Sequence, residues 1–159
     1  MSDFVYFATA PHGAEDLLVE ELRVLGIEAK ARSGGAGFTG ELAAGLQAAL
    51  WLRTASKLLL ELGELAAADG DALYASARAL DWTAHLERGA TFAVQASGTG
   101  TIDNSHFAAL RVKDAIVDQL RERWGERPDV DTQSPDLWLR VHLRGPVAKL
   151  SLDLGGEGL

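Results

Sequence analysis

The chain has 159 residues, a length typical of one domain or of two small ones. Hydrophobic residues make up 47% of it and charged residues 24%, a composition that supplies a core and excludes a disordered protein. The absence of cysteine excludes disulfides and thiolate metal sites, and the formal net charge of -8 argues against attraction of nucleic acid by the whole surface.

The first third of the chain predicts a compact unit of four strands and two helices. Strands are expected over residues 4–9, 27–32, 36–40 and 56–65. A helix is expected from residue 14 onward, where leucines recur at helical spacing and Gly26 suits the C-terminal cap. A second helix is expected over residues 41–52. The order βαββαβ is that of the ferredoxin-like fold, a small sheet with both helices on one face.

A stretch of alanine, glycine and aspartate at residues 66–71 predicts a boundary, which gives units of residues 1–66 and 67–159. In the second unit, helices are expected over residues 71–80 and 81–86, and a strand over 91–97 that Gly98-Thr99-Gly100 ends. A long helix follows over residues 105–124, and strands over 137–144 and 147–154 form a hairpin. The second unit therefore has the order ααβαββ, and the predicted class of the chain is α+β.

Most signs of catalysis or cofactor binding are missing. The glycine loop at Gly98 has Asp103 where a nucleotide-binding loop has its third glycine, so a turn with a helix cap at Asn104 or Ser105 is favoured over a cofactor site. The four histidines lack metal-ligand spacing. No apolar stretch is long enough to span a membrane and no secretory signal is recognisable, so a cytoplasmic location without a membrane partner is expected.

Lys113 interrupts the apolar stripe of the helix expected over residues 105–124. One interpretation is that its aliphatic stem packs at the edge of the core while the ammonium reaches solvent. The other is that Lys113 joins Asn104, Ser105 and His106 near the helix N-terminus in a compact phosphate site.

The strand expected over residues 137–144 has a basic and aromatic face. Alternation places four side chains on this face, Trp138, Arg140, His142 and Arg144. The neighbouring strand adds Lys149, and its Ser151 and Asp153 are expected to point the same way. A ring among cations suits the bases and phosphates of irregular RNA. The alternative is an ordinary solvated sheet face, with Trp138 packed on a helix.

Several segments of the chain carry a family resemblance at consistent spacing. They are TAPHGAEDLLVEELRVL (residues 9–25), LWLRTASK (50–57), ALDW (79–82), ATFAV (90–94), Asn104-Ser105, VKDAIVD (112–118) and DLGGEGL (153–159). Together they resemble the N-terminal part of bacterial 23S ribosomal RNA guanine-N2 methyltransferases. The resemblance implies a ferredoxin-like domain followed by a THUMP domain, an RNA-binding module.

The resemblance also implies roles for individual residues. The VKDAIVD match singles out Lys113, and Arg111 on the same helix is a further candidate RNA contact. The LWLRTASK match adds Arg53 and Lys57, which could instead pair with nearby carboxylates such as Glu61. The family's methyltransferase domain, with its cofactor loop and its Asn/Asp-Pro-Pro-aromatic motif, is expected beyond the junction at residues 153–159.

These observations predict a noncatalytic fragment that positions 23S rRNA for guanine-N2 methylation by a methyltransferase domain of the same polypeptide. No cofactor is expected in this fragment, whereas S-adenosylmethionine is expected for the parent enzyme. The alternative is a protein-interaction or spacer module that orients the catalytic domain without contacting RNA, which the net charge of -8 favours. A small-ligand sensor is a third possibility, supported only by the loop at Gly98.

Overall fold

A computed structural model describes residues 4–32, 34–41, 44–45, 48 and 57–154. Its α-carbon contacts divide the chain into two compact units, Met1–Leu62 with Leu152–Leu159, and Gly63–Ser151. Helices and strands are mixed in both units, and the predicted α+β class is confirmed.

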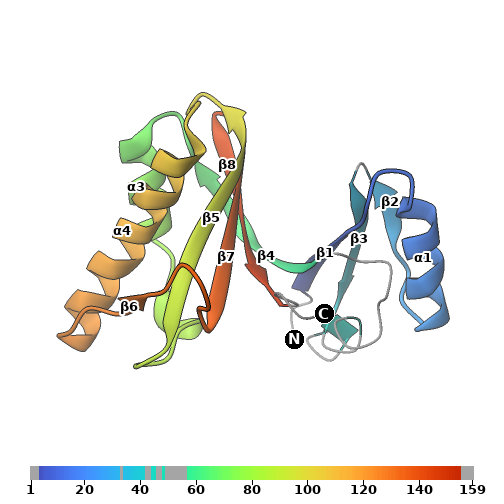
Figure 1. The fold of residues 1–159 in the computed structure, drawn as a ribbon, viewed down its shortest axis with the longest axis horizontal. Coiled ribbons are helices and arrows are strands. Elements are labelled where there is room, and N and C mark those ends of the chain that lie inside the picture. Colours follow the sequence, from blue (N-terminus) through green and yellow to red (C-terminus); the bar gives the residue numbers. More distant parts are fainter. Residues whose placement is uncertain (1–3, 33, 42–43, 46–47, 49–56, 155–159) are drawn as a thin grey trace. The chain divides into compact units, whose positions relative to one another are not determined.

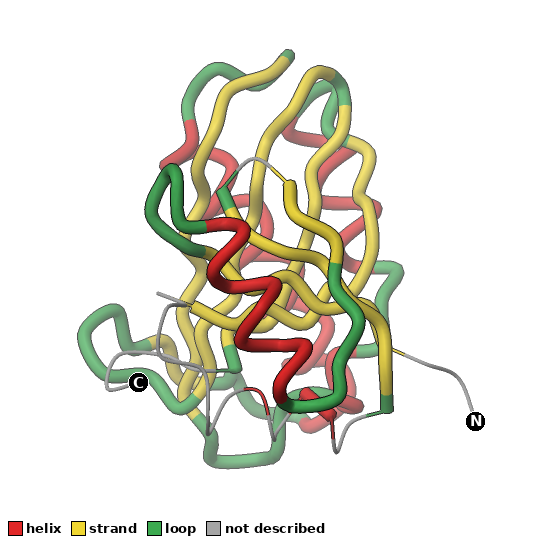
Figure 2. Tube along the Cα trace, turned by 90° about the vertical axis from the view of Figure 1, so that its right-hand side faces the viewer, coloured by secondary structure: helices red, strands yellow, loops and turns green. Residues whose placement is uncertain are grey.

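The first unit is an antiparallel sheet with a helix on one face. Its elements are β1 (Phe4–Thr9), α1 (Glu15–Val24), β2 (Lys30–Arg32), β3 (Gly35–Gly40) and the first part of β4 (Lys57–Ala66), with strand order β2-β3-β1-β4. Figures 1 and 2 show α1 over one face of these strands. Most of the helix predicted over residues 41–52 lies outside the described residues.

The sequence of α1 explains where the helix begins and ends. Glu15 and Asp16 complement the positive N-terminal end of the helix dipole. Gly26 has a φ of 83°, a left-handed conformation that suits glycine just after a helix. Leu18 and Leu22, four residues apart, are fully buried against the sheet.

The second unit places two helices on one face of a mixed sheet (Figure 1). Its elements are α3 (Gly70–Arg78), the 3₁₀ turn η1 (Trp82–Ala84), β5 (Thr91–Gly100), α4 (Ser105–Trp124), β6 (Asp129–Val130), β7 (Leu137–Gly145) and β8 (Val147–Asp153). The strand order is β8-β7-β5-β6, and β5 runs parallel to both β6 and β7. The core between helices and sheet contains large fully buried side chains such as Trp82, Phe92, Ile116, Leu120 and Leu139.

Two details of the second unit differ from the prediction. The helix expected over residues 81–86 is a single 3₁₀ turn. The expectation that Gly98-Thr99-Gly100 ends the strand is wrong, because these residues are the last three of β5 and continue its parallel pairing with β7. A Cβ atom at Gly98 would lie 2.5 Å from the carbonyl oxygen of Leu143, so glycine here allows the two strands to approach.

Candidate nucleic-acid interface

β7 has one apolar face and one polar face, as its alternation predicts. The side toward the helices holds three buried residues, Leu139, Val141 and Leu143. The opposite side holds the predicted aromatic and basic residues, Trp138, Arg140, His142 and Arg144. The first two of these are half-buried and the last two are exposed. We call the side that these four residues form the β7 face.

The parallel neighbour β5 extends the β7 face with hydrogen-bonding side chains. The register places Ser97 beside His142 and Thr99 beside Arg144. The hydroxyl oxygen of Ser97 lies 3.2 Å from Nδ1 of His142. The β7 face therefore combines cations with neutral groups that can bond ribose or base edges.

Arg140 lies over the indole ring of Trp138. The guanidinium carbon is 4.8 Å from the ring centroid, within the range of a cation–π contact. The contact holds an aromatic surface and a positive charge side by side. This pairing suits a nucleotide, whose base stacks on rings or guanidinium planes and whose phosphate attracts cations.

β8 adds Lys149 but not the two other residues predicted to accompany it. Lys149 is exposed between the buried Ala148 and Leu150. Ser151 and Asp153, which were expected to point the same way as Lys149, are both buried and do not join an exposed surface. Alternation gives only the direction of a side chain, and other parts of the chain can still cover it.

The residues expected at the N-terminus of α4 do not form a compact group with Lys113. Asn104 is the N-cap, and its Oδ1 accepts the backbone N–H of Phe107 at 3.0 Å, which confirms the predicted cap. Ser105 is half-buried and His106 is exposed. At roughly 1.5 Å per residue, Lys113 lies about 12 Å further along the helix than Ser105. The structure therefore separates Lys113 from the capped end.

Lys113 is engaged by the residue that follows it. Its Nζ lies 2.8 Å from Oδ1 of Asp114, and its side chain is 24% exposed. A cation already paired with a carboxylate attracts phosphate less strongly than an unpaired one. Lys113 thus stays a candidate RNA contact, with a competing partner.

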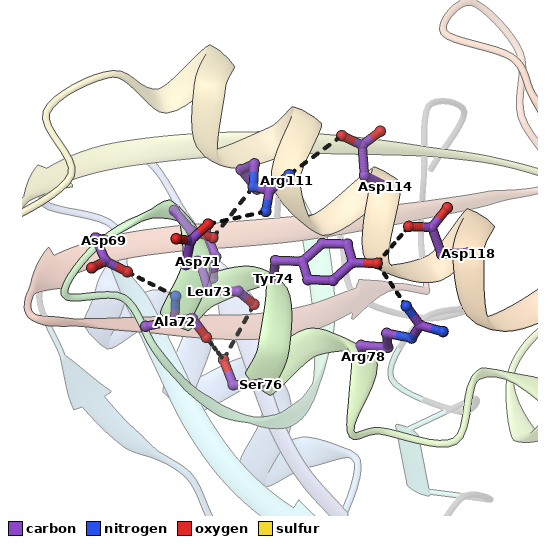
Figure 3. A network of polar contacts seen from close by, with 11 residues as sticks. Asp69, Asp71, Ala72, Leu73, Tyr74, Ser76, Arg78, Arg111, Asp114 and Asp118 are labelled. Carbon is purple, nitrogen blue, oxygen red and sulfur yellow. Dashed lines mark hydrogen bonds and ion pairs between the residues drawn. The ribbon is translucent and has the colours of Figure 1, made fainter.

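Arg111 belongs to a polar network between α3 and α4 (Figure 3). Its guanidinium lies 3.5 Å from Asp71 and 3.9 Å from Asp114, and its Nε donates to the carbonyl of Gly70 at 3.3 Å. The same group lies 4.6 Å from the ring centroid of Tyr74. These contacts give Arg111 a part in joining the two helices.

Tyr74 links this network to the middle of α4 (Figure 3). Its hydroxyl donates to a carboxylate oxygen of Asp118 and accepts from Nη1 of Arg78 at 2.8 Å. The hydrogen bond to Asp118 is the main reason why the pKa of Tyr74 is raised, since ionised tyrosine could not donate it. This network was not predicted from the sequence, where its local signals are Tyr74 and Arg78 at i, i+4 spacing and Arg111 and Asp114 at i, i+3 spacing.

Of the two candidate RNA contacts in the first unit, Arg53 and Lys57, the structure describes only Lys57. Arg53 lies outside the described residues. Lys57 is the first residue of β4 and is half-buried, and its backbone carbonyl accepts from the hydroxyl of Thr9 at 3.5 Å. The structure therefore places Lys57 at the start of β4, beside the end of β1.

The structure bears on two kinds of site, a phosphate-binding loop at Gly98 and a metal site. The Gly98-Thr99-Gly100 segment lies against β7, where a Cβ at Gly100 would be 2.3 Å from the carbonyl oxygen of Gly145, so it does not form a phosphate-binding loop. Within the described part of the chain, no group of three or more histidine, aspartate or glutamate residues could hold a metal ion. None of the described helices is long and apolar enough to span a membrane.

Two family models match the chain. The THUMP domain model matches residues 67–153, and the RlmL ferredoxin-like domain model matches residues 5–59. These matches agree with the βαββαβ and ααβαββ orders expected for the two parts of the chain.

Curated relatives match almost the whole chain. The ribosomal RNA large subunit methyltransferase K/L of Syntrophotalea carbinolica is 46% identical over 97% of this chain, and that of Pseudomonas aeruginosa is 45% identical over 96%. The match covers 22% and 21% of those proteins, so the chain spans about a fifth of their length.

Solved structures share the fold. A predicted N6-adenine-specific DNA methylase from Listeria monocytogenes superposes with a TM-score of 0.83 at 28% identity, covering 96% of this chain and 40% of that one. The SMU.472 protein complexed with SAH has a TM-score of 0.83 at 26% identity, covering 96% and 42%. In both, the matched region is less than half of the solved chain.

Proposed function

Because this chain belongs to the THUMP domain family, we propose that it is a noncatalytic RNA-binding region that positions 23S rRNA for guanine-N2 methylation. The methyl transfer itself is assigned to a methyltransferase domain of the same polypeptide that uses S-adenosylmethionine, in the cytoplasm. The proposed domain limits are residues 1–66 for the ferredoxin-like domain and 67–159 for the THUMP domain with the start of the linker to the methyltransferase domain.

The names of the relatives support the rRNA part of this proposal, because they are large-subunit rRNA methyltransferases. The SAH complex of a structural neighbour supports S-adenosylmethionine as the methyl donor of the parent enzyme. The RNA is assigned to this chain on the family match and on the residues of its own surface.

The β7 face is the observation that carries the proposal. On this face Arg144 is exposed, and the guanidinium of Arg140 lies over the ring of Trp138. Ser97 and His142 lie within hydrogen-bonding distance of each other. Aromatic stacking and arginine contacts to phosphate serve RNA whose bases are not fully paired. We therefore assign irregular or single-stranded rRNA to this face.

The spacer alternative also has an observation in its favour. On α4, Arg121 pairs with Asp118 at 3.1 Å and Arg123 with Asp81 at 2.8 Å, in a chain of net charge -8. Cations held in such pairs contribute little to a positive surface. A module that only orients a catalytic domain would need no positively charged surface.

The test compares two double variants of equal charge. Replacing Arg140 and Arg144 by alanine removes two cations from the β7 face, and replacing Arg121 and Arg123 removes two from α4. The first variant is expected to lose at least about tenfold in affinity for labelled 23S rRNA hairpins, since hydrogen bonds to charged groups typically contribute more than 1 kcal/mol each. The second is expected to change affinity by less than about threefold. Fluorescence anisotropy gives the affinities, and circular dichroism verifies that each variant is folded.

Equal affinities for the wild-type chain and the folded Arg140→Ala, Arg144→Ala variant would remove the β7 face from the proposal. Absence of RNA binding by the wild-type chain at low salt would support the spacer alternative.

A further inference from the structure

The sheet of the first unit has a face that the described helices leave open. On the α1 side, Tyr6 is fully buried and stacks on Phe38 with ring centroids 5.1 Å apart. A Cβ at Gly45 would lie 2.3 Å from the Tyr6 ring, so the helical residues 44–45 lie on this same side. Phe7 is adjacent to Tyr6 in an extended strand and therefore points to the opposite face.

The strand register fixes which residues share this open face. One row across the strands contains Arg32, Gly35, Thr9 and Lys57. The next row contains Lys30, Gly37, Phe7 and Leu59. With neighbouring strands about 4.8 Å apart, the two ends of a row are separated by about 14 Å. We call the surface formed by these two rows the β1–β3 face.

Two glycines leave the centre of the β1–β3 face without side chains. A Cβ at Gly35 would lie 2.0 Å from the carbonyl oxygen of Ala8 and 3.0 Å from Cζ of Phe7. A Cβ at Gly37 would lie 3.3 Å from the guanidinium carbon of Arg32. The aromatic ring and the guanidinium therefore lie along the sheet, over backbone that carries no side chains.

The cations of the β1–β3 face are not neutralised within the described residues. Lys30 and Arg32 are exposed, Lys57 is half-buried, and no ion pair joins any of the three to a carboxylate in the described part of the chain. Glu61 lies in the next row of the same face, opposite Val5 in the register, and interacts with another group. The two rows of the β1–β3 face thus contain three cations and no carboxylate, in a chain that is acidic overall.

From this placement we infer that the β1–β3 face is a second RNA contact surface and that it takes single-stranded RNA. Phe7 stacks on a base above Gly35 and Gly37. Lys30, Arg32 and Lys57 bind the flanking phosphates. A shallow sheet surface can contact unpaired bases, whereas paired bases in A-form RNA are inaccessible to side chains from the major groove. The inference rests on the proposed function of the chain and adds a surface in its first unit.

Charge removal on the β1–β3 face tests the inference. The probe is a short fluorescein-labelled oligouridylate, titrated with the 159-residue chain at several salt concentrations. The Lys30→Ala, Arg32→Ala variant is expected to bind at least about fivefold more weakly. The slope of log affinity against log salt is expected to become shallower by about 1.4, since each lost phosphate contact on a single strand contributes about 0.7. The matched control is Arg23→Ala with Arg127→Ala, which removes two exposed cations elsewhere and is expected to leave the slope unchanged.

A third variant tests stacking separately from charge. Phe7→Leu keeps an apolar side chain in the sheet but removes the aromatic ring. It is expected to lower affinity about tenfold without changing the salt slope, because base stacking is not electrostatic. An unchanged affinity in the folded variant would overturn the stacking role of Phe7.

The outcomes separate this inference from the function on which it rests. If the Lys30→Ala, Arg32→Ala variant behaves like its control while Arg140→Ala with Arg144→Ala weakens binding, the β1–β3 face is excluded and the proposed function stands. If only the first pair weakens binding, the inference is supported and the β7 face is excluded. If the wild-type chain binds neither the oligouridylate nor the rRNA hairpins, both proposals are overturned.

Discussion

Gln119 is a buried polar residue whose side chain fastens α4 to the end of α3. Its Oε1 accepts the backbone N–H of Trp82 at 2.9 Å, and its Nε2 donates to the carbonyl of Arg78 at 2.7 Å and to that of Leu80. One amide thereby satisfies the backbone groups released where α3 ends and η1 begins. This contact joins α4 to the segment that connects α3 and η1.

Gln119→Leu should destabilise the second unit without touching the candidate RNA surfaces. Leucine fits the volume but leaves one buried N–H and two carbonyls without their partner. We expect the free energy of unfolding in urea to fall by about 2 kcal/mol or more, since each unsatisfied buried group costs about 1–3 kcal/mol. Gln133→Leu, in an exposed turn, is the matched control and should change stability by less than about 0.5 kcal/mol. Equal stabilities of the two variants would contradict the fastening role.

At the scale of elements, α4 is the clearest case of local sequence signals setting a boundary. Asn104 caps its first turn, and Gly125 ends it with a φ of 76° in the left-handed region. Both ends agree with the prediction from sequence. The cap also bears on function, because Asn104 was singled out as an RNA contact and its Oδ1 already accepts the N–H of Phe107.

Asn104→Ala is expected to lower the free energy of unfolding by about 1 kcal/mol, the usual cost of losing an N-cap. Asn104→Ser, which can still accept the Phe107 N–H, should recover most of this loss. Thermal or urea unfolding of the two variants and the wild-type chain gives the comparison. If Asn104→Ala is as stable as Asn104→Ser but binds rRNA hairpins more weakly, the residue acts on RNA rather than as a cap.

Elements whose signals are non-local were harder to predict. Gly98 and Gly100 indicate a strand end when only neighbouring residues are considered, but they belong to β5 because β7 approaches them closely. The parallel pairing of β5 with β7 was likewise absent from the sequence analysis. A strand's own alternation contains no information on which distant strand will lie beside it.

The two candidate RNA surfaces also differ in whether local or non-local signals define them. The β7 face could be predicted because alternation within one strand defines it. Lys30 and Arg32 were not singled out from the sequence because β2 is a strand of three residues, and the proposed β1–β3 face depends on their pairing with Gly37 and Gly35 of β3. The partners of Arg111 could not be foreseen either, since Asp71 lies on a different helix.

For the whole molecule, the question is how a chain of net charge -8 could hold a polyanion. Several cations on α3 and α4 form ion pairs, such as Arg78 with Glu122 and Arg123 with Asp81. Arg144 on the β7 face and Lys30 and Arg32 on the β1–β3 face are exposed to solvent. At physiological salt, charges more than about 8 Å away are largely screened, so such local areas can attract phosphate despite the total charge.

The salt dependence of RNA binding should report how many cations take part. Arg140, Arg144 and Lys149 on the β7 face would release counterions from about three phosphates. Since each phosphate contact on single-stranded RNA contributes about -0.7, the slope of log affinity against log salt is expected to be about -2 for this face alone. Participation of Lys30, Arg32 and Lys57 would bring it to about -4. Anisotropy titrations of the wild-type chain over a series of NaCl concentrations measure the slope.

The Arg140→Ala, Arg144→Ala variant provides the internal comparison for this measurement, because removing two phosphate contacts should make the slope shallower by about 1.4. A slope of log affinity against log salt near zero in the wild-type chain would mean that its cations do not contact the RNA phosphates. Any remaining affinity would then have to come from stacking and hydrogen bonds alone, as at Trp138 and Phe7. Such a result would contradict the electrostatic part of both proposed surfaces, whatever the affinity itself.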